Sequence, residues 1–256
     1  MDTHEHNRRQ DANQEQFVAC YVFQLRISLM SNTQLLTTQA ELLMPTTPIL
    51  RSALAAAMLT VAPAAALTLS PATALAEMSP ESLVSALQEG GHVVFIRHAS
   101  TEADYADQVT ATMGDCSTQR TLSKGGWAEA RALGQAFDRL EIPVGDVVSS
   151  EYCRAWQTAD LAFGHHETSP ALNFESSEDY SDAEISTMRE QITPYLSGIP
   201  AQGLNTVLVG HDDPFEAATG IYPEPMGIAF ILLPKGDGAF DVLGSIPVDA
   251  WPQDLN

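Results

Sequence analysis

The sequence is poor in basic residues. Its 256 residues include 12 Lys and Arg against 33 Asp and Glu, so the formal net charge is −21. This imbalance belongs mainly to the part that follows residue 77, and it argues against binding to nucleic acid or to an anionic membrane surface. An anionic substrate would therefore have to be captured by local arginines against the field of the whole protein. The hydrophobic content of 45% is still enough for a sizeable core.

Long apolar runs are also scarce, and the most prominent one lies near the N-terminus. A short segment with one positive charge, Met44 to Arg51, precedes an apolar run that ends in the small residues Ala74-Leu75-Ala76. This order is typical of a secretory signal peptide. We therefore expect a signal peptide at 44–76 that is cleaved after Ala76, a mature domain at 77–256, and a periplasmic or secreted location.

Two further expectations concern the N-terminal part. A membrane anchor is the alternative to a signal peptide, because the apolar run is long enough to span a bilayer. Its prolines, its many alanines and the small residues at its end favour cleavage. After cleavage, no stable insertion into the membrane is expected. Residues 1–43 are polar and glutamine-rich, and our hypothesis is that translation starts at Met44 and that they are a non-native or disordered extension.

Cysteine is rare, with three residues in the chain. Cys20 falls in the doubtful extension, which leaves Cys116 and Cys153, an even number in a chain expected to be exported. A disulfide between these two is therefore predicted; two free buried thiols are the alternative. Neither cysteine lies in a glycine-flanked loop of the kind that activates a thiolate, which argues against thiol catalysis.

Alternating apolar strands and amphipathic helices are expected to fill the mature domain, without internal repeats. Ser79 and Pro80 predict a helix start, and Ser123 caps the next helix, whose apolar face we assign to Trp127, Ala130, Leu133, Phe137 and Leu140. Further helices are expected at 154–163 and 182–196, and strands at 93–96, 142–148, 206–211, 228–233 and 239–246. This order predicts an α/β fold, a three-layer sandwich in which helices flank a mostly parallel central sheet.

Cationic side chains follow three of the predicted strands. Arg97 and His98 end the first strand, Arg154 follows the strand that ends at Ser149-Ser150, and His211 follows Gly210. Because sites in α/β sheets lie at the carboxyl ends of the strands, we expect these two arginines and two histidines to converge on an anion.

These segments resemble, in chain order, the motifs of the histidine phosphatase superfamily, the phosphoglycerate-mutase-like proteins. Arg97-His98-Ala99-Ser100-Thr101 resembles the Arg-His-Gly motif of the family. The segments 122–126, 149–159 and 209–211 resemble its later blocks. The resemblance covers roughly Glu81 to the C-terminus and implies a domain of that fold.

The resemblance also implies roles for the site. His98 would be the nucleophile that forms a phosphohistidine, Arg97 and Arg154 would hold the phosphoryl oxygens, and His211 would be a second donor to them. Thr101 is assigned to substrate binding, and Arg120 either extends the positive rim or only fixes its loop. The chemistry requires no metal and no cofactor.

Some positions depart from the family pattern. Ala99 stands where glycine is usual, and Asp104 stands where a phosphate-contacting asparagine is often found in the mutases. No clear counterpart of the mutase glutamate is found, so the proton donor is open between Asp212, which resembles the His-Asp pair of the acid-phosphatase branch, and Asp213 or Glu102.

Together these features predict an exported phosphomonoester hydrolase of the histidine acid phosphatase type, acting on a small phosphorylated substrate. A phosphomutase is a lower-ranked alternative. A catalytically silent protein that binds phosphate or a phosphoglycan on the same fold is another. No feature of the sequence specifies an oligomeric state.

Overall fold

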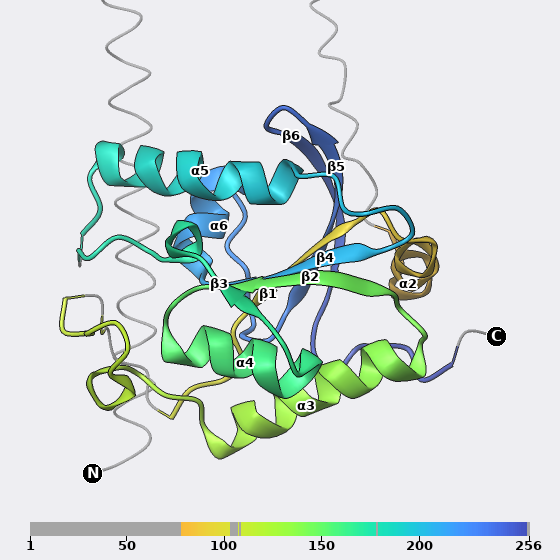
Figure 1. The fold of residues 1–256 in the computed structure, drawn as a ribbon, viewed down its shortest axis with the longest axis horizontal. Coiled ribbons are helices and arrows are strands. Elements are labelled where there is room, and N and C mark those ends of the chain that lie inside the picture. Colours follow the sequence, from red (N-terminus) through yellow and green to blue (C-terminus); the bar gives the residue numbers. More distant parts are fainter. Residues whose placement is uncertain (1–77, 103–106, 108, 178, 255–256) are drawn as a thin grey trace, which may run out of the picture. The chain divides into compact units, whose positions relative to one another are not determined.

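A computed structural model describes residues 78–102, 107, 109–177 and 179–254 (Figure 1). These residues belong to the second of two compact units into which the chain divides, Ser70–Asn256. The first unit, Met1–Leu69, lies outside the described residues, as do the expected signal peptide and the extension before it. Among the described helices, none is both long enough and apolar enough to cross a membrane.

In the described part of the chain, the predicted helices and strands occur in the predicted order, and the structure adds a short strand at Glu167–Thr168 and a helix at Asp212–Thr219 that were not predicted. The elements are α2 (Pro80–Glu89), β1 (Val93–Arg97), η1 (Cys116–Thr118), α3 (Lys124–Arg139), β2 (Val144–Ser149), α4 (Cys153–Phe163), β3 (Glu167–Thr168), η2 (Pro170–Leu172), α5 (Asp182–Ser197), β4 (Asn205–Gly210), α6 (Asp212–Thr219), β5 (Ala229–Gly236) and β6 (Ala239–Ile246). The predicted caps are confirmed, since the Ser79 and Ser123 side chains accept hydrogen bonds from the first turns of α2 and α3.

The strands of the described residues form one six-stranded sheet in the order β3-β2-β4-β1-β5-β6. The neighbours from β3 to β1 are parallel, whereas β5 and β6 pair antiparallel. All five residues of β1 are buried, which fits a central strand that is covered on both faces. The predicted mostly parallel sheet is confirmed, and β6 lies at one edge of it.

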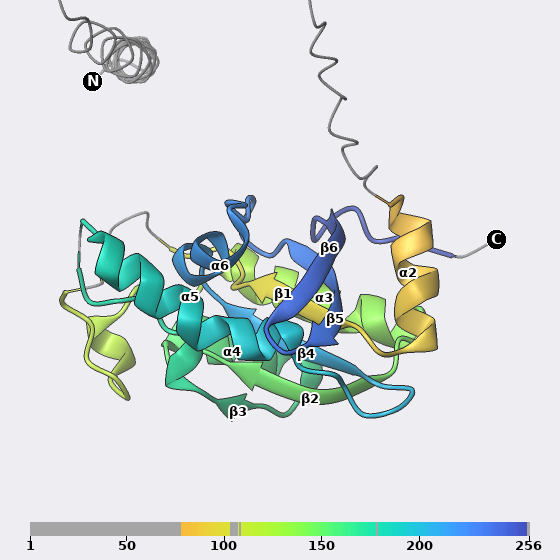
Figure 2. The ribbon, with the colours of Figure 1, turned by 90° about the horizontal axis from the view of Figure 1, so that it is seen from above.

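Helices cover both faces of the sheet, which confirms the three-layer sandwich (Figures 1 and 2). Alternate residues of each strand point to opposite faces: Val94 and Ile96 join the core under α2, α3 and α4, whereas Val93 and Phe95 join the core under α5 and α6. Phe95 stacks on Phe215 of α6, with ring centroids 4.3 Å apart.

Two glycines of α3 allow the helix to approach its neighbours closely. A Cβ atom at Gly126 would lie 1.9 Å from the carbonyl oxygen of Ser100, and one at Gly134 would lie 2.1 Å from that of Ala162 on α4. The start of α3 therefore packs closely against the segment that follows β1. The chain between Ser100 and α3 thus returns to the end of β1.

The assignment of Trp127 to the apolar face of α3 is wrong. Gly126 and Ala130 face the interior, and Trp127 is turned outward with 39% of its surface exposed. It covers part of the guanidinium of Arg131, which lies 5.4 Å from its ring centroid.

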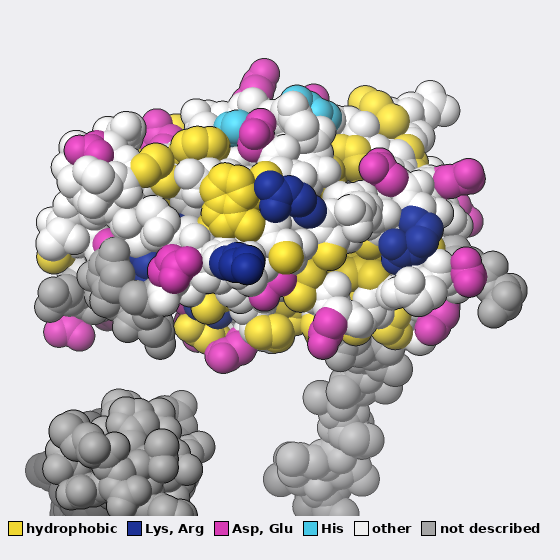
Figure 3. Space-filling view, turned by 90° about the horizontal axis from the view of Figure 1, so that it is seen from below, with side chains coloured by type: hydrophobic (Ala, Val, Ile, Leu, Met, Phe, Trp, Pro, Cys, Tyr) yellow, Lys and Arg dark blue, Asp and Glu magenta, His cyan; other side chains and the backbone are white. Residues whose placement is uncertain are grey.

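Figure 3 views the molecule from the side on which α3 and α4 lie in Figure 1, and shows Lys and Arg side chains among acidic and hydrophobic ones.

Candidate active site

The carboxyl ends of three adjacent strands define the candidate site. In the sheet β1 lies beside β4 and β4 beside β2. Arg97 pairs with Gly210, and Ser149 pairs with Val209, so the three strands end at nearly the same level. Each following residue therefore leaves the sheet at the same edge, and segments more than a hundred residues apart in sequence meet there.

His98 is fully buried and has a fixed hydrogen-bonding arrangement. Its Nδ1 lies 2.8 Å from the carbonyl oxygen of Ala99. A carbonyl only accepts, so Nδ1 carries the proton and Nε2 presents its lone pair. Burial, and next the charge of Arg154, hold the pKa of His98 well below its ordinary value. The ring is therefore neutral near pH 7, and its nucleophilic lone pair lies on Nε2, where it accepts a hydrogen bond from Arg154.

Arg154 lies in the first turn of α4 and connects His98 to a buried carboxylate. Its Nε donates to Nε2 of His98 over 3.1 Å, and its Nη1 donates to Oδ2 of Asp107 over 2.9 Å. The two side chains of this ion pair are 3% and 2% exposed. Asp107 also accepts from the backbone N–H of Arg120, so one carboxylate positions the guanidinium and holds the loop that covers it.

Arg97 is held from the opposite side by α6 and the segment after it. Its Nη1 donates to the carbonyl oxygen of Pro223 over 3.0 Å, and its Nη2 donates to Oδ2 of Asp212 over 2.7 Å. The hydroxyl of Tyr222 donates to the same carboxylate oxygen over 2.8 Å. Asp212 therefore receives two donors and orients the Arg97 guanidinium.

His211 is fully buried and lies beside His98, with ring centroids 5.3 Å apart. Its Nε2 lies 2.8 Å from the hydroxyl oxygen of Ser150. The rings of Tyr152 and Phe174 face it edge-on at 5.1 and 4.6 Å. Burial, and next the charge of Arg154, hold the pKa of His211 well below its ordinary value.

Nε of Arg97 and Nδ1 of His211 are buried without a hydrogen-bond partner among the described residues. A buried donor that stays unpaired is costly, and such atoms mark places where a ligand completes the hydrogen bonding. Nε of Arg97 is a donor in a cluster that also holds Arg154, so its missing partner is an oxyanion. Nδ1 of His211 can donate to the same anion only in a ring form that carries a proton on this nitrogen.

The predicted disulfide is confirmed. Cys116 and Cys153 are bonded, with their Cα atoms 5.7 Å apart. The buried side chain of Gln119 adds a second connection, because its Oε1 accepts from the backbone N–H of Cys153 over 2.8 Å. These two contacts fasten the loop that contains Asp107 to the start of α4, directly beside Arg154.

Arg120 and Thr101, the two residues expected to contribute to substrate binding, have different positions. Arg120 is half-buried, and its charge is close enough to lower the pKa of His98, His211 and Arg154, each of which is lowered chiefly by burial. Thr101 is half-buried, pairs with Leu122 in a short β-bridge, and its hydroxyl contacts the sulfur of Met226 at 3.9 Å. Arg120 thus adds to the positive field, and the role of Thr101 in substrate binding stays a prediction.

The three candidate proton donors lie in unlike surroundings. Asp212 is occupied by Arg97 and Tyr222, as described above. Asp213 accepts a hydrogen bond from the hydroxyl of Tyr180 over 3.0 Å, and burial, with the nearby charge of Asp212, raises its pKa to about 6. Glu102 is exposed. Asp104 lies outside the described residues.

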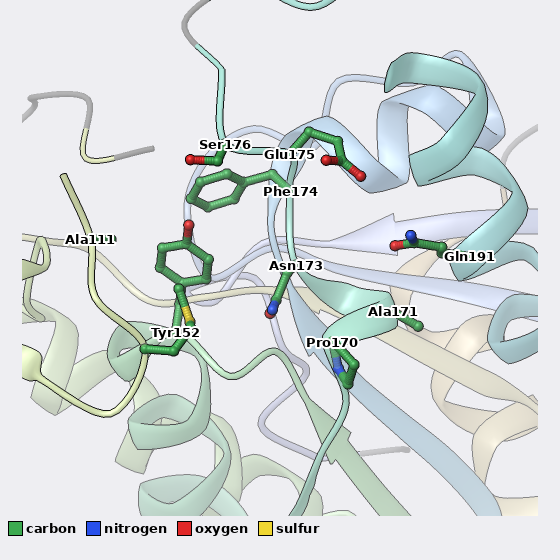
Figure 4. Close-up of a pocket in the computed structure, with 10 residues that line it drawn as sticks. Ala111, Tyr152, Pro170, Ala171, Asn173, Phe174, Glu175, Ser176 and Gln191 are labelled. Atoms are coloured by element: carbon green, nitrogen blue, oxygen red, sulfur yellow. The ribbon is translucent and has the colours of Figure 1, made fainter. Parts of the chain in front are cut away.

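A cavity of about 620 Å³ lies next to the site. Figure 4 shows the rings of Tyr152 and Phe174 along one wall, with Gln191 across from them. Asn173 also lines the cavity, and its amide oxygen accepts from the Ser150 hydroxyl over 2.7 Å. The cavity is therefore connected to His211 through two hydrogen-bonded side chains.

Asp107, Asn173 and Tyr222 were not anticipated from the sequence. Asp107 and Tyr222 hold the two arginines, and Asn173 is linked to His211. All three lie in irregular segments whose residues show no periodicity, so no pattern marked them. In the described part of the chain, no group of three or more His, Cys, Asp or Glu side chains is placed to hold a metal ion.

Residues 93–196 match the family model of the histidine phosphatase superfamily (branch 1). The matched range runs from β1 into α5 and includes Arg97, His98 and Arg154, whereas His211 lies beyond it. A comparison with curated protein sequences finds no match.

Several solved structures are similar to this chain. The protein histidine phosphatase SixA, complexed with tungstate, is 14% identical; the match covers 62% of this chain and 97% of SixA, with a TM-score of 0.44. TTHB049 from Thermus thermophilus is 23% identical, with 61% and 99% covered and a TM-score of 0.42. Phosphoserine phosphatase from Entamoeba histolytica, in complex with 3-phosphoglyceric acid, is 12% identical, with 60% and 95% covered and a TM-score of 0.44.

Proposed function

Residues 93–196 belong to the histidine phosphatase superfamily (branch 1), and from this premise we propose that the protein is an exported phosphomonoesterase that works through a phosphohistidine intermediate. The observation that carries the proposal is the pair of unpartnered buried nitrogens, Arg97 Nε and His211 Nδ1, beside the Nε2 lone pair of His98. A phosphoryl oxygen would supply the hydrogen-bond partner that these nitrogens lack.

In the first step Nε2 of His98 attacks phosphorus as the bond from phosphorus to the leaving oxygen breaks. The leaving oxygen takes a proton from a carboxylic acid, and the product is a phosphohistidine. Arg154, Arg97 and His211 donate to the non-bridging oxygens, and these charge-assisted bonds strengthen as charge spreads over them. In the second step water attacks phosphorus, the phosphorus–nitrogen bond breaks, and the carboxylate takes the water proton.

Asp213 is the proton donor that we propose. A group with a pKa of about 6 can hold a proton in mildly acid solution and release it in the transition state. It follows Asp212 in the first turn of α6, and its partner Tyr180 packs against the cluster of Tyr152 and Phe174 around His211. The carboxylate of Asp212, with donors from Arg97 and Tyr222, instead positions Arg97.

Export is supported by two features. The segment 44–76 has the order of a signal peptide. The Cys116–Cys153 bond is of a kind that persists in oxidising compartments. N-terminal sequencing of the protein recovered from the periplasm or medium should read from Glu77, and recovery from the cytosol with an intact segment 44–76 would contradict export.

The test of the activity uses a chromogenic aryl phosphate and the mature chain. We expect release of phosphate by the wild type and loss of release in His98→Ala, with phosphate still bound by the variant. His165→Ala is the matched control, because it removes an exposed imidazole in the segment that follows α4, and it should keep the wild-type rate. Binding of phosphate by the wild type without turnover from acidic to neutral pH would instead identify a binding protein.

A further inference from the structure

The two nitrogens of the His211 ring have different surroundings. Nε2 lies 2.8 Å from the hydroxyl oxygen of Ser150, and Nδ1 is buried with no hydrogen-bond partner in the described part of the chain. Which nitrogen carries the proton decides whether the ring can donate to an anion. The hydrogen bonds behind Ser150 settle this.

Asn173 fixes the direction of the hydrogen bonds. Its Nδ2 donates to the carboxylate of Glu151 over 2.8 Å, because a carboxylate only accepts. The amide oxygen therefore faces the other way, where it accepts from the backbone N–H of Glu151 over 3.0 Å and from the hydroxyl of Ser150 over 2.7 Å.

Ser150 then has no proton left for His211. A hydroxyl has one proton and two lone pairs. The proton goes to Asn173, and one lone pair accepts from the backbone N–H of Tyr152 over 3.1 Å. The other lone pair faces Nε2 of His211, so Nε2 carries a proton. In the neutral ring Nδ1 is consequently a bare lone pair.

A bare lone pair repels an oxyanion, so the empty site is not yet able to bind one through His211. We propose that Glu151, Asn173 and Ser150 hold His211 with its proton on Nε2, so that a tetrahedral dianion binds only together with one proton, which Nδ1 takes up. This inference rests on the proposed function, because the anion site is the phosphoryl site. Ser150 and Asn173 are positioning residues in this arrangement.

Because of the charged groups around His211, the ring takes up a proton only when the anion binds. Arg154 on α4, His98 and Arg97 after and at the end of β1, and Arg120 from the loop before α3 all disfavour a positive ring while the site is empty. Two carboxylates of the site are already paired with arginines, Asp107 with Arg154 and Asp212 with Arg97. Asp213, in the first turn of the helix that His211 precedes, accepts a hydrogen bond from Tyr180.

An arriving dianion reverses this balance. Two negative charges beside the ring favour the imidazolium, and the Nδ1–H then donates a charge-assisted hydrogen bond. His98 does not follow the same course, because its Nδ1 proton is given to the Ala99 carbonyl and its Nε2 faces the phosphorus position. The two histidines thus enter the reaction in different protonation states.

Sulfate is the probe that tests this, because it is a tetrahedral dianion with no proton of its own to exchange near neutral pH. Isothermal titration calorimetry at pH 7, in buffers of unlike ionisation enthalpy, counts the protons taken up per sulfate bound. We expect about one proton for the wild type, and a dissociation constant that rises about tenfold per pH unit.

Ser150→Ala is the informative variant. Without the hydroxyl, the neutral ring can place its proton on Nδ1 and donate to sulfate directly, so the uptake should fall toward zero while sulfate still binds. Ser149→Ala is the matched control. It removes a buried hydroxyl from the preceding residue, one that bonds to the Ser150 carbonyl and not to His211, and it should keep the wild-type uptake.

Three results would overturn the inference: no proton uptake by the wild type, full uptake by Ser150→Ala, or no sulfate binding. Should the variant not fold, ¹⁵N chemical shifts of His211 in the sulfate-free wild type decide instead, and a proton on Nδ1 rather than Nε2 contradicts the inference. Aryl phosphate hydrolysis is scored separately. Sulfate-linked uptake without hydrolysis rejects the proposed function alone, and hydrolysis without uptake rejects this inference alone.

Discussion

His98 and His211 lie 5.3 Å apart between ring centroids, and both are fully buried. They are nevertheless anchored through opposite nitrogens. His98 gives its Nδ1 proton to a backbone carbonyl, whereas His211 faces a chain of side chains through Nε2. The backbone can supply only an acceptor here, so His98 is fixed as a ring whose Nε2 carries a lone pair, which accepts from Nε of Arg154. The protonation of His211 depends on its neighbours and can respond to a ligand.

The arginines differ in a similar way. Arg154 shares a carboxylate with the loop before α3, in an ion pair that is almost completely buried. Arg97 pairs with Asp212, whose side chain is 18% exposed, beside the half-exposed Tyr222. The half of the site around His98 and Arg154 is thus held by buried contacts and a disulfide. The half around Arg97 and Asp212 lies closer to solvent.

The largest effect should separate the two histidines. His98→Ala removes the nucleophile, and turnover of an aryl phosphate should fall at least about a thousandfold. His211→Ala removes one donor to the phosphoryl oxygens and should cost about a hundredfold. Steady-state kcat values of the two variants measure the difference. Equal losses, or a larger loss in His211→Ala, would mean that the roles are assigned to the wrong rings.

The next effect concerns the disulfide that holds the His98 half. The bond closes a loop over a sequence separation of 37, and its removal should lower the free energy of unfolding by about 4 kcal/mol on the chain-entropy model. Urea denaturation of the wild type and of a Cys116→Ala, Cys153→Ala double variant measures this. Reductant should destabilise the wild type alone, so an equal response of the double variant would contradict the prediction.

Asp107→Asn tests the buried ion pair itself. An unpaired guanidinium would be left beside His98, and we expect a loss of about 3 kcal/mol in the free energy of unfolding. Turnover should fall as well, because Arg154 loses the contact that orients it. The control is Asp138→Asn on the exposed side of α3. If both variants are equally stable, Asp107 does not hold Arg154 in solution.

Asp213→Asn has the smallest expected effect on stability, and this effect is seen in the pH dependence. The pKa of Asp213 is raised to about 6 in the folded protein and is near 3.9 in an unfolded chain. Between these values the folded state keeps a proton that the unfolded state has lost, so stability falls as pH rises. We expect the wild type to lose roughly 2 kcal/mol from pH 4 to 7 relative to Asp213→Asn. If the free energies of unfolding of the wild type and of Asp213→Asn changed equally with pH, the pKa of Asp213 would not be raised in the folded protein.

Much of this arrangement could be predicted from the sequence. Arg97, His98 and His211 end apolar strands, and parallel strands place such ends together, so their meeting follows from the fold. Asp107 could not be predicted in this way, because its partner Arg154 is 47 residues away and the loop between has no period. The helix α6 after His211 was not anticipated either, although two aspartates, an early proline and Gly220 at its end are ordinary helix signals.

Trapping the intermediate tests the central claim most directly. The mature protein would be mixed with a ³²P-labelled phosphomonoester, quenched in base within one turnover, and digested for peptide mapping. We predict an acid-labile, base-stable label on His98, absent from His98→Ala and present in Ser149→Ala. Turnover without a protein-bound label, or a label on any other residue, would contradict the account.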